Sequence, residues 1–181
     1  MVSRLSSCLR AAKSPLLLIS MAIGVLLLGA CSRQFSVSVN QQTLYDPRPY
    51  SGVVRVADPG LQSCINVTMR QNEYNDPEQI SVIACPLLEI ASLEGIEALE
   101  GLRFIDLSGN ELETLDALQR LPRLTSVNAP DNQLKDISGL LVIDTLTSAV
   151  LTGNPSIPCD QLETLRERLA QNLISPENCQ S

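Results

Sequence analysis

The apolar residues in the middle of the chain recur with a 22-residue period. The most regular copy is LRFIDLSGNELETLDAL, residues 102–118, in which the apolar positions follow neither a helical nor an alternating strand spacing. Its apolar residues and its central asparagine are Leu102, Ile105, Leu107, Asn110, Leu112, Leu115 and Leu118. Further copies begin in the same phase at Ile80, Leu124 and Leu146. Repetition at this period predicts a stack of similar coils that share one continuous core.

Each regular copy is divided by its asparagine into a short strand and a return limb. In the copy at 102–118, residues 103–107 predict the strand, and we expect the inward side chains of Ile105 and Leu107 to stack on the next coil. The return limb, residues 112–118, is too short for a full helix within a 22-residue coil. The pattern therefore predicts extended or 3-10 turns on that side.

This pattern resembles the leucine-rich repeat family, whose repeat reads L-x-x-L-x-L-x-x-N-x-L. The 22-residue length and the segment LKDISGL at 134–140 are similar to the bacterial internalin-type subclass. The resemblance covers residues 80–158, which hold about four repeats. It implies an α/β solenoid, a short leucine-rich repeat coil with parallel strands on a concave face and irregular or 3-10 structure on the convex side.

The resemblance also assigns a role to the repeated asparagines. In the family their side-chain amides bond backbone groups of neighbouring coils and form a ladder, because a buried amide must be satisfied at both ends. The asparagines at this position are Asn110, Asn132 and Asn154. The first copy has Leu88 there instead, which predicts a cap-like coil at the N-terminal end of the ladder.

Residues 1–30 predict an export signal. Residues 1–14 carry three positive charges, and residues 15–30 are almost wholly apolar but shorter than the ~20 residues that span a bilayer. LGAC at 28–31 resembles the bacterial lipobox. This resemblance implies cleavage before Cys31, transfer of diacylglycerol to the Cys31 thiol, and acylation of the new amino terminus, with chains such as palmitate. An uncleaved membrane anchor and simple secretion are the alternatives.

Residues 31–50 follow the signal as a polar tether in which a short strand over 35–39 is possible. Ser32, the residue after the lipobox cysteine, fits the sorting rule of Gram-negative lipoproteins, in which a residue other than Asp favours the outer membrane. The resemblance therefore implies a lipid-anchored protein of the cell envelope. Its domain faces either the periplasm or the cell exterior.

Both ends of the repeat stack need a cover, because a terminal coil cannot leave its apolar face open. Residues 51–79 are the predicted N-terminal cap, and alternation at 53–56 and 64–69 around the turn signal DPG predicts a hairpin or two short strands. Residues 159–181 are the predicted C-terminal cap, a helix with one apolar face. The leucines of that face are Leu162, Leu165, Leu169 and Leu173.

Four cysteines lie in or beside the predicted caps, and they are Cys64, Cys85, Cys159 and Cys179. Four cysteines allow three pairings, and an exported protein folds where disulfides persist. Because the repeats separate the two ends of the stack, the local pairs Cys64–Cys85 and Cys159–Cys179 are favoured. A buried free thiol is the alternative for Cys85, which occupies an inward repeat position.

Composition and charge exclude several classes of function. The net charge is −7, and the part of the chain from Cys31 onward holds 10 basic and 20 acidic groups, which argues against nucleic acid and against binding to anionic lipid through a basic patch. The chain has no histidine, so it lacks the usual general base and the commonest metal ligand. No cysteine pair has zinc-site spacing and no glycine-rich phosphate loop is present. The sequence therefore predicts no enzyme, no cofactor, no metal and no small-molecule substrate.

The outward positions of the strands are the candidate protein-binding residues, because the family usually binds through its concave face. Aligning the copies places these positions in rows that cross the coils. The candidates are Arg103, Phe104, Asp106, Ser108, Ser126, Asn128, Ser148 and Val150. Phe104 is their only aromatic residue and the candidate anchor, although a single exposed apolar residue is common on protein surfaces.

The sequence thus predicts a non-catalytic protein-binding module that is attached to the membrane by N-terminal lipid. One alternative is a structural envelope component that contacts the cell wall or an assembly machinery. Another is a surface-exposed protein for adhesion or host contact. Protease treatment of whole cells separates the alternatives, because only a surface-exposed domain is cut.

Overall fold

A computed structural model describes residues 36–39, 42–47 and 54–179 of the chain. The chain divides into two compact units, residues 1–34 and 35–181, and every described residue belongs to the second unit. The predicted signal peptide and its lipidation residue Cys31 lie outside the described residues. In the part of the chain that is described, no helix has the length and apolar character needed to cross a membrane.

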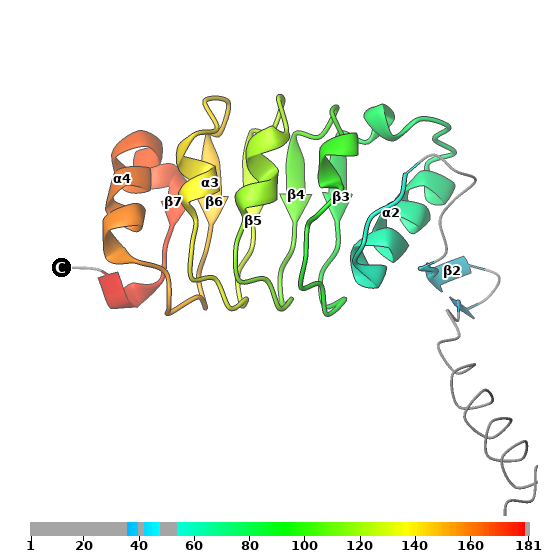
Figure 1. Ribbon diagram of the computed structural model, residues 1–181, viewed down its shortest axis with the longest axis horizontal. Helices are drawn as coiled ribbons and strands as arrows, with labels where there is room; N and C mark the ends of the chain where they lie inside the picture. Colours follow the sequence, from blue (N-terminus) through cyan, green and yellow to red (C-terminus); the bar gives the residue numbers. More distant parts are fainter. Residues whose placement is uncertain (1–35, 40–41, 48–53, 180–181) are drawn as a thin grey trace, which may run out of the picture. The chain divides into compact units, whose positions relative to one another are not determined.

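Five short parallel strands lie side by side in sequence order (Figure 1). They are β3 (Val82–Ala84), β4 (Phe104–Asp106), β5 (Ser126–Asn128), β6 (Ser148–Val150) and β7 (Leu173–Ile174). From β3 to β6, each residue pairs with the residue 22 positions further along the chain. The 22-residue register that the sequence predicts is therefore confirmed.

The core is aliphatic and runs behind the strands. In each of β3, β4, β5 and β6 the middle residue is buried and its two neighbours are at least partly exposed. This is expected because successive side chains of a strand point to opposite faces. These middle residues are Ile83, Ile105, Val127 and Ala149. Burying a Leu, Ile or Val side chain contributes about 1.5–3 kcal/mol, so the repeated apolar positions supply most of the driving force for folding.

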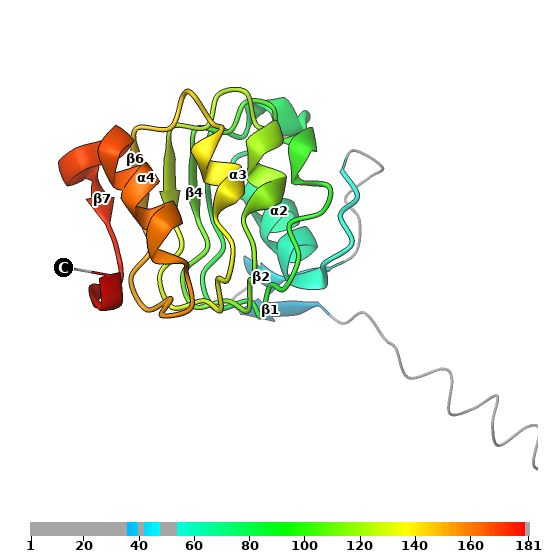
Figure 2. The ribbon, with the colours of Figure 1, turned by 60° about the vertical axis from the view of Figure 1, so that its left-hand side comes forward.

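The return limbs form a side opposite the strands, which we call the return side (Figure 2). It carries the 3-10 helices η3 (Ile96–Ala98) and η4 (Asp116–Arg120) and the single-turn helix α3 (Ser138–Leu141). The predicted 3-10 turns are therefore present in two coils, and the third coil has one turn of α-helix instead. Another 3-10 helix, η2 (Pro77–Gln79), precedes β3.

The asparagine side chains join neighbouring coils. Asn132 accepts a hydrogen bond from the Leu112 N–H at 3.1 Å and donates to the carbonyls of Leu107 at 3.0 Å and Ala129 at 3.3 Å. Asn110 and Asn154 make the corresponding bonds one coil earlier and one coil later. Each of these amides is buried and satisfied at both its oxygen and its nitrogen, as such groups must be.

The residue before each ladder asparagine has a positive φ. Gly109 and Gly153 have φ of 67° and 72°, and Asp131 has 54° at the same place in the third copy. Glycine adopts this conformation without steric cost, and aspartate is among the few other residues that adopt it regularly. This left-handed residue turns the chain so that the asparagine side chain points inward.

The N-terminal cap is helical, so the predicted β-type cap of residues 51–79 is wrong. Helix α2, Pro59–Gln71, begins after Asp58, whose carboxylate accepts a hydrogen bond from the Leu61 N–H at 3.0 Å. The DPG segment therefore starts a helix, with proline at the first position. Leu61, Ile65 and Met69 lie four residues apart and are buried, so α2 has an apolar stripe at helical spacing.

Asp58 also joins α2 to the first coil, which has no ladder asparagine of its own. Its second carboxylate oxygen accepts hydrogen bonds from the N–H groups of Ala91 at 3.0 Å and Ser92 at 3.3 Å. The oxygen of Asn110 bonds the N–H groups of Leu88 and Ile90 from the other side, both at 3.0 Å. The first coil is thus held on one side by the ladder and on the other by the N-terminal cap.

Two further strands lie within the predicted tether. Strands β1 (Val37–Val39) and β2 (Gln42–Tyr45) form an antiparallel pair beside α2 in Figures 1 and 2. The next residue, Asp46, is buried and forms an ion pair with Arg70 of α2 at 2.9 Å. Its N–H also donates to the hydroxyl of Ser63 at 2.7 Å. This part of the predicted tether is therefore attached to the N-terminal cap.

The C-terminal cap is a helix followed by a strand. Helix α4, Cys159–Leu169, carries the predicted apolar face as far as Leu169. Ala170 then has φ of 48°, and the 3-10 helix η5 (Ala170–Asn172) leads into β7. The prediction that Leu173 continues the helix is therefore wrong, because Leu173 pairs with Ala149 in the sheet. The 3-10 helix η6 (Glu177–Cys179) follows β7.

Two disulfides fasten the caps. Cys64–Cys85 joins α2 to the first coil, and Cys159–Cys179 joins the start of α4 to η6. Arg168 adds a polar contact at the C-terminal end, because its guanidinium donates to the carbonyls of Leu140 at 3.3 Å and Ile143 at 2.7 Å. These carbonyls lie in and just after α3, so α4 is fixed to the last return limb.

Candidate functional site

The outward side chains of the strands form aligned rows across the sheet. One row consists of Val82, Phe104, Ser126 and Ser148. The next row consists of Ala84, Asp106, Asn128 and Val150. Ser108 follows β4, and the exposed Arg103 precedes it. We call the following set the strand face: Val82, Ala84, Phe104, Asp106, Ser108, Ser126, Asn128, Ser148, Val150 and Ile174.

Hydrogen bonds fix the polar side chains of the strand face. One carboxylate oxygen of Asp106, Oδ1, accepts from the Ser108 N–H at 2.9 Å and also from the Ser108 hydroxyl. That hydroxyl accepts from Asn128 Nδ2 at 3.0 Å. In the neighbouring row the hydroxyls of Ser126 and Ser148 are 2.7 Å apart. These side chains are therefore held in place before any partner arrives, which lowers the entropy cost of binding.

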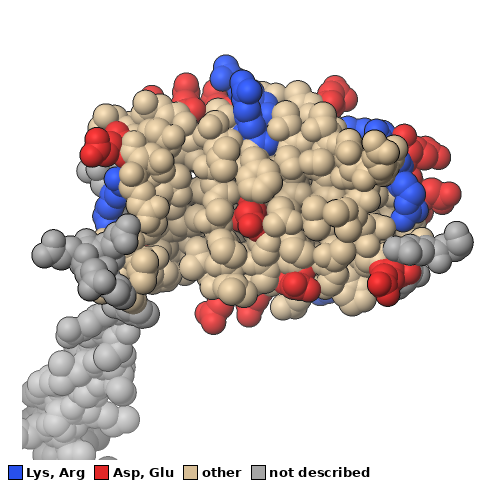
Figure 3. Space-filling view, turned by 180° about the vertical axis from the view of Figure 1, so that it is seen from behind, with Lys and Arg blue, Asp and Glu red and all other residues tan. Residues whose placement is uncertain are grey.

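Apolar side chains surround this polar network. Phe104 is half-buried near the middle of the face, and Val82 and Ile174 are 59% and 54% exposed toward its two ends. Seen from behind in Figure 3, the molecule shows a largely uncharged surface, with most charged groups near its margins and one acidic group near the centre. Val82 is the row neighbour of Phe104, whereas Ile174 lies at the other end of the sheet beside Val150.

Sequence reasoning located most of this surface but missed one end. Ile174 belongs to β7, whose two residues carry no repeat signal and lie in the segment predicted to be helical. Ile174 pairs with Val150, so it extends the row of Asp106, Asn128 and Val150. Its own sequence neighbourhood gives no indication of this pairing. Leu87, which is 78% exposed in the loop after β3, was also missed because the repeat assigns no outward role to that position.

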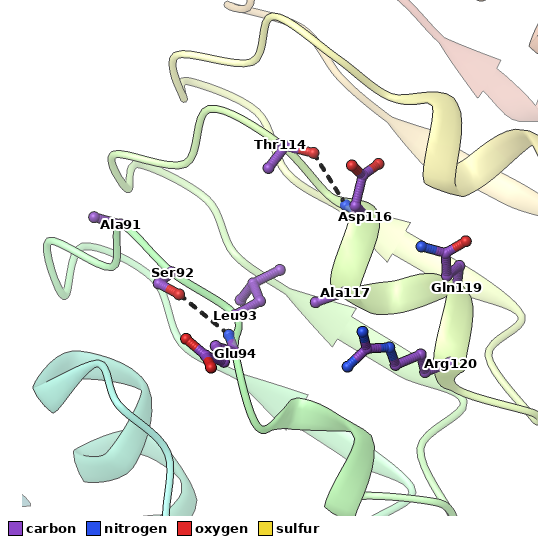
Figure 4. A pocket seen from close by; sticks show the side chains of 9 residues that line it. All are labelled: Ala91, Ser92, Leu93, Glu94, Thr114, Asp116, Ala117, Gln119 and Arg120. Atoms are coloured by element: carbon purple, nitrogen blue, oxygen red, sulfur yellow. Dashed lines mark hydrogen bonds between the residues drawn. The ribbon is translucent and has the colours of Figure 1, made fainter.

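The return side contains a hollow of about 320 Å³ between two successive return limbs (Figure 4). Two of its polar side chains cap backbone groups: Ser92 Oγ accepts from the Glu94 N–H and Thr114 Oγ1 accepts from the Asp116 N–H, both at 3.2 Å. Arg120 forms an exposed ion pair with Glu97 at 3.4 Å. Among the described residues, no group of three or more His, Cys, Asp or Glu side chains could hold a metal ion.

Comparison with known proteins shows a likeness in structure. No protein-family model matches the chain, and no curated protein matches it. An internalin (inlF) of Listeria monocytogenes superposes with a TM-score of 0.56 and 24% identity, over 67% of this chain and 37% of that chain. Internalin C2 of the same organism superposes with a TM-score of 0.49 and 21% identity, over 54% of this chain and 46% of that chain.

The chain spans less than half the length of either internalin. The likeness to the internalin inlF shows an internalin-like leucine-rich repeat fold and carries no further information on activity.

Proposed function

We propose that this chain is a non-catalytic protein-binding module, a short leucine-rich repeat solenoid held at the bacterial cell envelope by acyl chains on Cys31. The strand face is its binding surface. The observation that carries the proposal is the combination of Phe104, exposed apolar neighbours and a pre-fixed polar network on one rigid sheet. Such a surface binds by shape and hydrogen bonding. The Ser108 hydroxyl bonds the Asp106 carboxylate, but a carboxylate is a weak base for a serine hydroxyl, and the chain has no histidine to activate it.

The size of the strand face limits what it binds. Five strands spaced about 4.8 Å apart span roughly 19 Å, and three residues of strand extend about 10 Å. A standard interface buries about 800 Å² on each partner. The strand face alone is smaller than this, so it fits one protruding loop or extended segment of a partner better than a broad globular surface.

The proposed anchor keeps the domain close to its membrane. Ser36, the first described residue, is the fifth residue after Cys31, and a fully extended chain of that length reaches at most about 18 Å. The attachment of the β1–β2 pair to α2 through Asp46 supports a short connection rather than a long tether. Several acyl chains hold such a protein stably, since each buried CH₂ contributes about 0.8 kcal/mol. Partners are therefore proteins at or near the membrane.

Ser32 favours the outer membrane as the location, with the domain facing the periplasm or the exterior. A structural contact with the cell wall or an assembly machinery, and adhesion or host contact at the surface, remain the alternatives to recognition of a membrane-proximal protein. Protease added to intact cells distinguishes them, since cleavage places the domain outside the cell.

The lipid anchor is tested by labelling cells with radioactive palmitate. The wild-type protein is expected to incorporate the label and to sediment with membranes, whereas Cys31→Ser is expected to lose both properties because it lacks the acceptor thiol. Cys8→Ser, which changes a cysteine in the predicted signal, is the matched control and should keep the label. Label retained by Cys31→Ser contradicts the proposed anchor.

The binding surface is tested with Phe104→Ala in the full-length protein, purified with its partners from detergent-solubilised envelopes. We expect partner recovery to fall at least tenfold, because the largest side chain of the strand face is removed. The free energy of unfolding should change by no more than about 1 kcal/mol, the range of one cross-strand pair. Val142→Ala, which truncates an exposed apolar residue just after α3, is the control and should leave recovery unchanged. Equal recovery by both variants refutes the proposed surface.

A further inference from the structure

We propose that Asp106 makes the strand face selective for a partner segment that presents a lysine side chain between uncharged residues. This inference rests on the proposed binding role of the strand face and goes beyond it by naming the chemistry of the partner. It depends on the position of the carboxylate, on the hydrogen bonds that it already makes, and on the absence of a cation paired with it among the described residues.

The Asp106 carboxylate is fixed so that one oxygen remains available. Asp106 lies on β4, an interior strand that pairs with β3 on one side and β5 on the other. Its Oδ1 receives both the N–H and the hydroxyl of Ser108. Within the described part of the chain, Oδ2 receives no hydrogen bond. A carboxylate oxygen accepts about two hydrogen bonds, so further donors are directed to Oδ2.

No basic side chain of the described residues forms an ion pair with this carboxylate. The described ion pairs join Arg70 to Asp46, Arg120 to Glu97 and Lys135 to Glu113, and none includes Asp106. Burying an unpaired carboxylate under a neutral partner leaves a desolvated charge without compensation, which strongly disfavours that complex. A partner with a cation in register escapes this penalty, and the acidic domain attracts it over a longer range.

The geometry favours lysine over arginine. A guanidinium binds a carboxylate best with two parallel hydrogen bonds to both oxygens, but Oδ1 of Asp106 is already occupied by Ser108. An ammonium group is a compact donor that needs only one oxygen. Phe104 lies two residues earlier on the same face of β4, about 6.6 Å along the strand, where its ring can cover the aliphatic stem of a lysine.

The rest of the strand face sets the neighbours of that lysine. Val82, Val150 and Ile174 are apolar, and the hydroxyls of Ser126 and Ser148 share one hydrogen bond, so one of the two O–H groups is used within the pair. Charged residues next to the lysine would be desolvated against these groups without a partner. The expected ligand is therefore a short segment with a single lysine and uncharged residues on either side.

The test measures binding of three blocked pentapeptides to the full-length lipidated protein in detergent micelles. The peptides are acetyl-Ala-Val-Lys-Val-Ala-amide and its analogues with arginine or norleucine at the centre. Amide NMR shifts give both affinity and location. We expect the lysine peptide to bind at least tenfold more tightly than the norleucine peptide and about threefold more tightly than the arginine peptide, with shifts confined to the strand face.

Asp106→Asn keeps the Oδ1 acceptor for Ser108 and removes the charge, so it is expected to lower lysine-peptide affinity at least tenfold to the norleucine level without loss of the folded NMR spectrum. Glu111→Gln, at an exposed acid with no described side-chain hydrogen bond, is the matched control and should bind as the wild type does. Equal affinities for the three peptides, an unaffected Asp106→Asn variant, or no binding of the lysine peptide at millimolar concentration each overturns the inference. If Phe104→Ala nevertheless loses its envelope partner, the proposed function stands and only the lysine selectivity fails.

Discussion

At the scale of single residues, the ladder asparagines show how a short side chain fixes the spacing of coils. Asn132 satisfies groups of its own coil and of the preceding one, namely the Leu112 N–H and the carbonyls of Leu107 and Ala129. No other side chain of similar length offers both two donors and an acceptor in one plane. The repeated asparagine was therefore a strong sequence signal for the fold.

We expect Asn132→Ala to lower the free energy of unfolding by about 2–5 kcal/mol, because two or more buried backbone groups lose their partners at about 1–3 kcal/mol each. Urea unfolding followed by circular dichroism measures this change. Asn128→Ala is the matched control, since that side chain is only partly buried and bonds only Ser108 among the described residues. Its cost should stay below about 1 kcal/mol. An equal loss of unfolding free energy in the two variants would show that the ladder asparagine stabilises the fold no more than a partly buried surface asparagine does.

Asp58 shows why one residue at the N-terminal end was not predictable. It lies more than one repeat length before Ala91 and Ser92, whose N–H groups it bonds, and no repeat phase connects them. The sequence indicated only that the first copy lacked its asparagine at Leu88. Which residue replaces it depends on where α2 packs, and that is a tertiary property.

At the scale of elements, the strands followed from the period but the caps did not. Ile65, Val67 and Thr68 are β-branched and favour strands when judged locally, yet they lie in α2. The helical spacing of Leu61, Ile65 and Met69 was present in the sequence and was the better signal. Tertiary contact with the first coil and the Asp58 cap outweigh the local preference.

The C-terminal cap was predictable in part for a similar reason. The leucine spacing indicated α4 correctly up to Leu169, because that face packs on the last coil. The spacing of Leu173 also fits a helix, but the positive φ of Ala170 ends the helix before it. A two-residue strand such as β7 forms only because β6 offers it an edge, so local sequence carries almost no trace of it.

Asp136 links the third return limb to the C-terminal cap and makes the stability of this contact depend on pH. The pKa of Asp136 lies below its ordinary value of 3.8. The largest cause is the hydrogen bond that its carboxylate accepts from the Ser138 N–H, followed by the hydrogen bonds from the side chains of Gln161 and Ser138. A pKa lowered by folding means that the contribution to stability is present above pH 3.8 and is lost as the pH falls through the folded-state pKa.

We therefore expect wild-type protein to be more stable than Asp136→Asn at pH 7, and we expect the difference to shrink as the pH falls below about 4. Urea unfolding of both proteins from pH 7 to pH 2.5 measures it. Gln161→Leu, which removes one donor to the carboxylate, should narrow the pH-dependent part of the difference. A difference that stays constant across this range contradicts the assignment.

At the scale of the whole molecule, the sequence predicted the arrangement of the strand face better than its chemistry. The 22-residue period placed Phe104 beside Ser126 and Asp106 beside Asn128, and the strand pairing confirms those rows. The network from Asp106 through Ser108 to Asn128 was not predicted, because it depends on side-chain orientations within and between coils. The predicted tether contains strands attached to α2, so the proposed connection between Cys31 and the domain is shorter than the predicted tether of residues 31–50.

The central claim is that the strand face binds a protein at the envelope, and site-specific photocrosslinking in living cells tests it most directly. A photoreactive amino acid is placed at Ser126 on the strand face or at Gln119, an exposed residue of η4 on the return side. The account predicts one discrete crosslinked product from position 126 and none from position 119. A product from position 119 with none from position 126, or equal products from both, would contradict it.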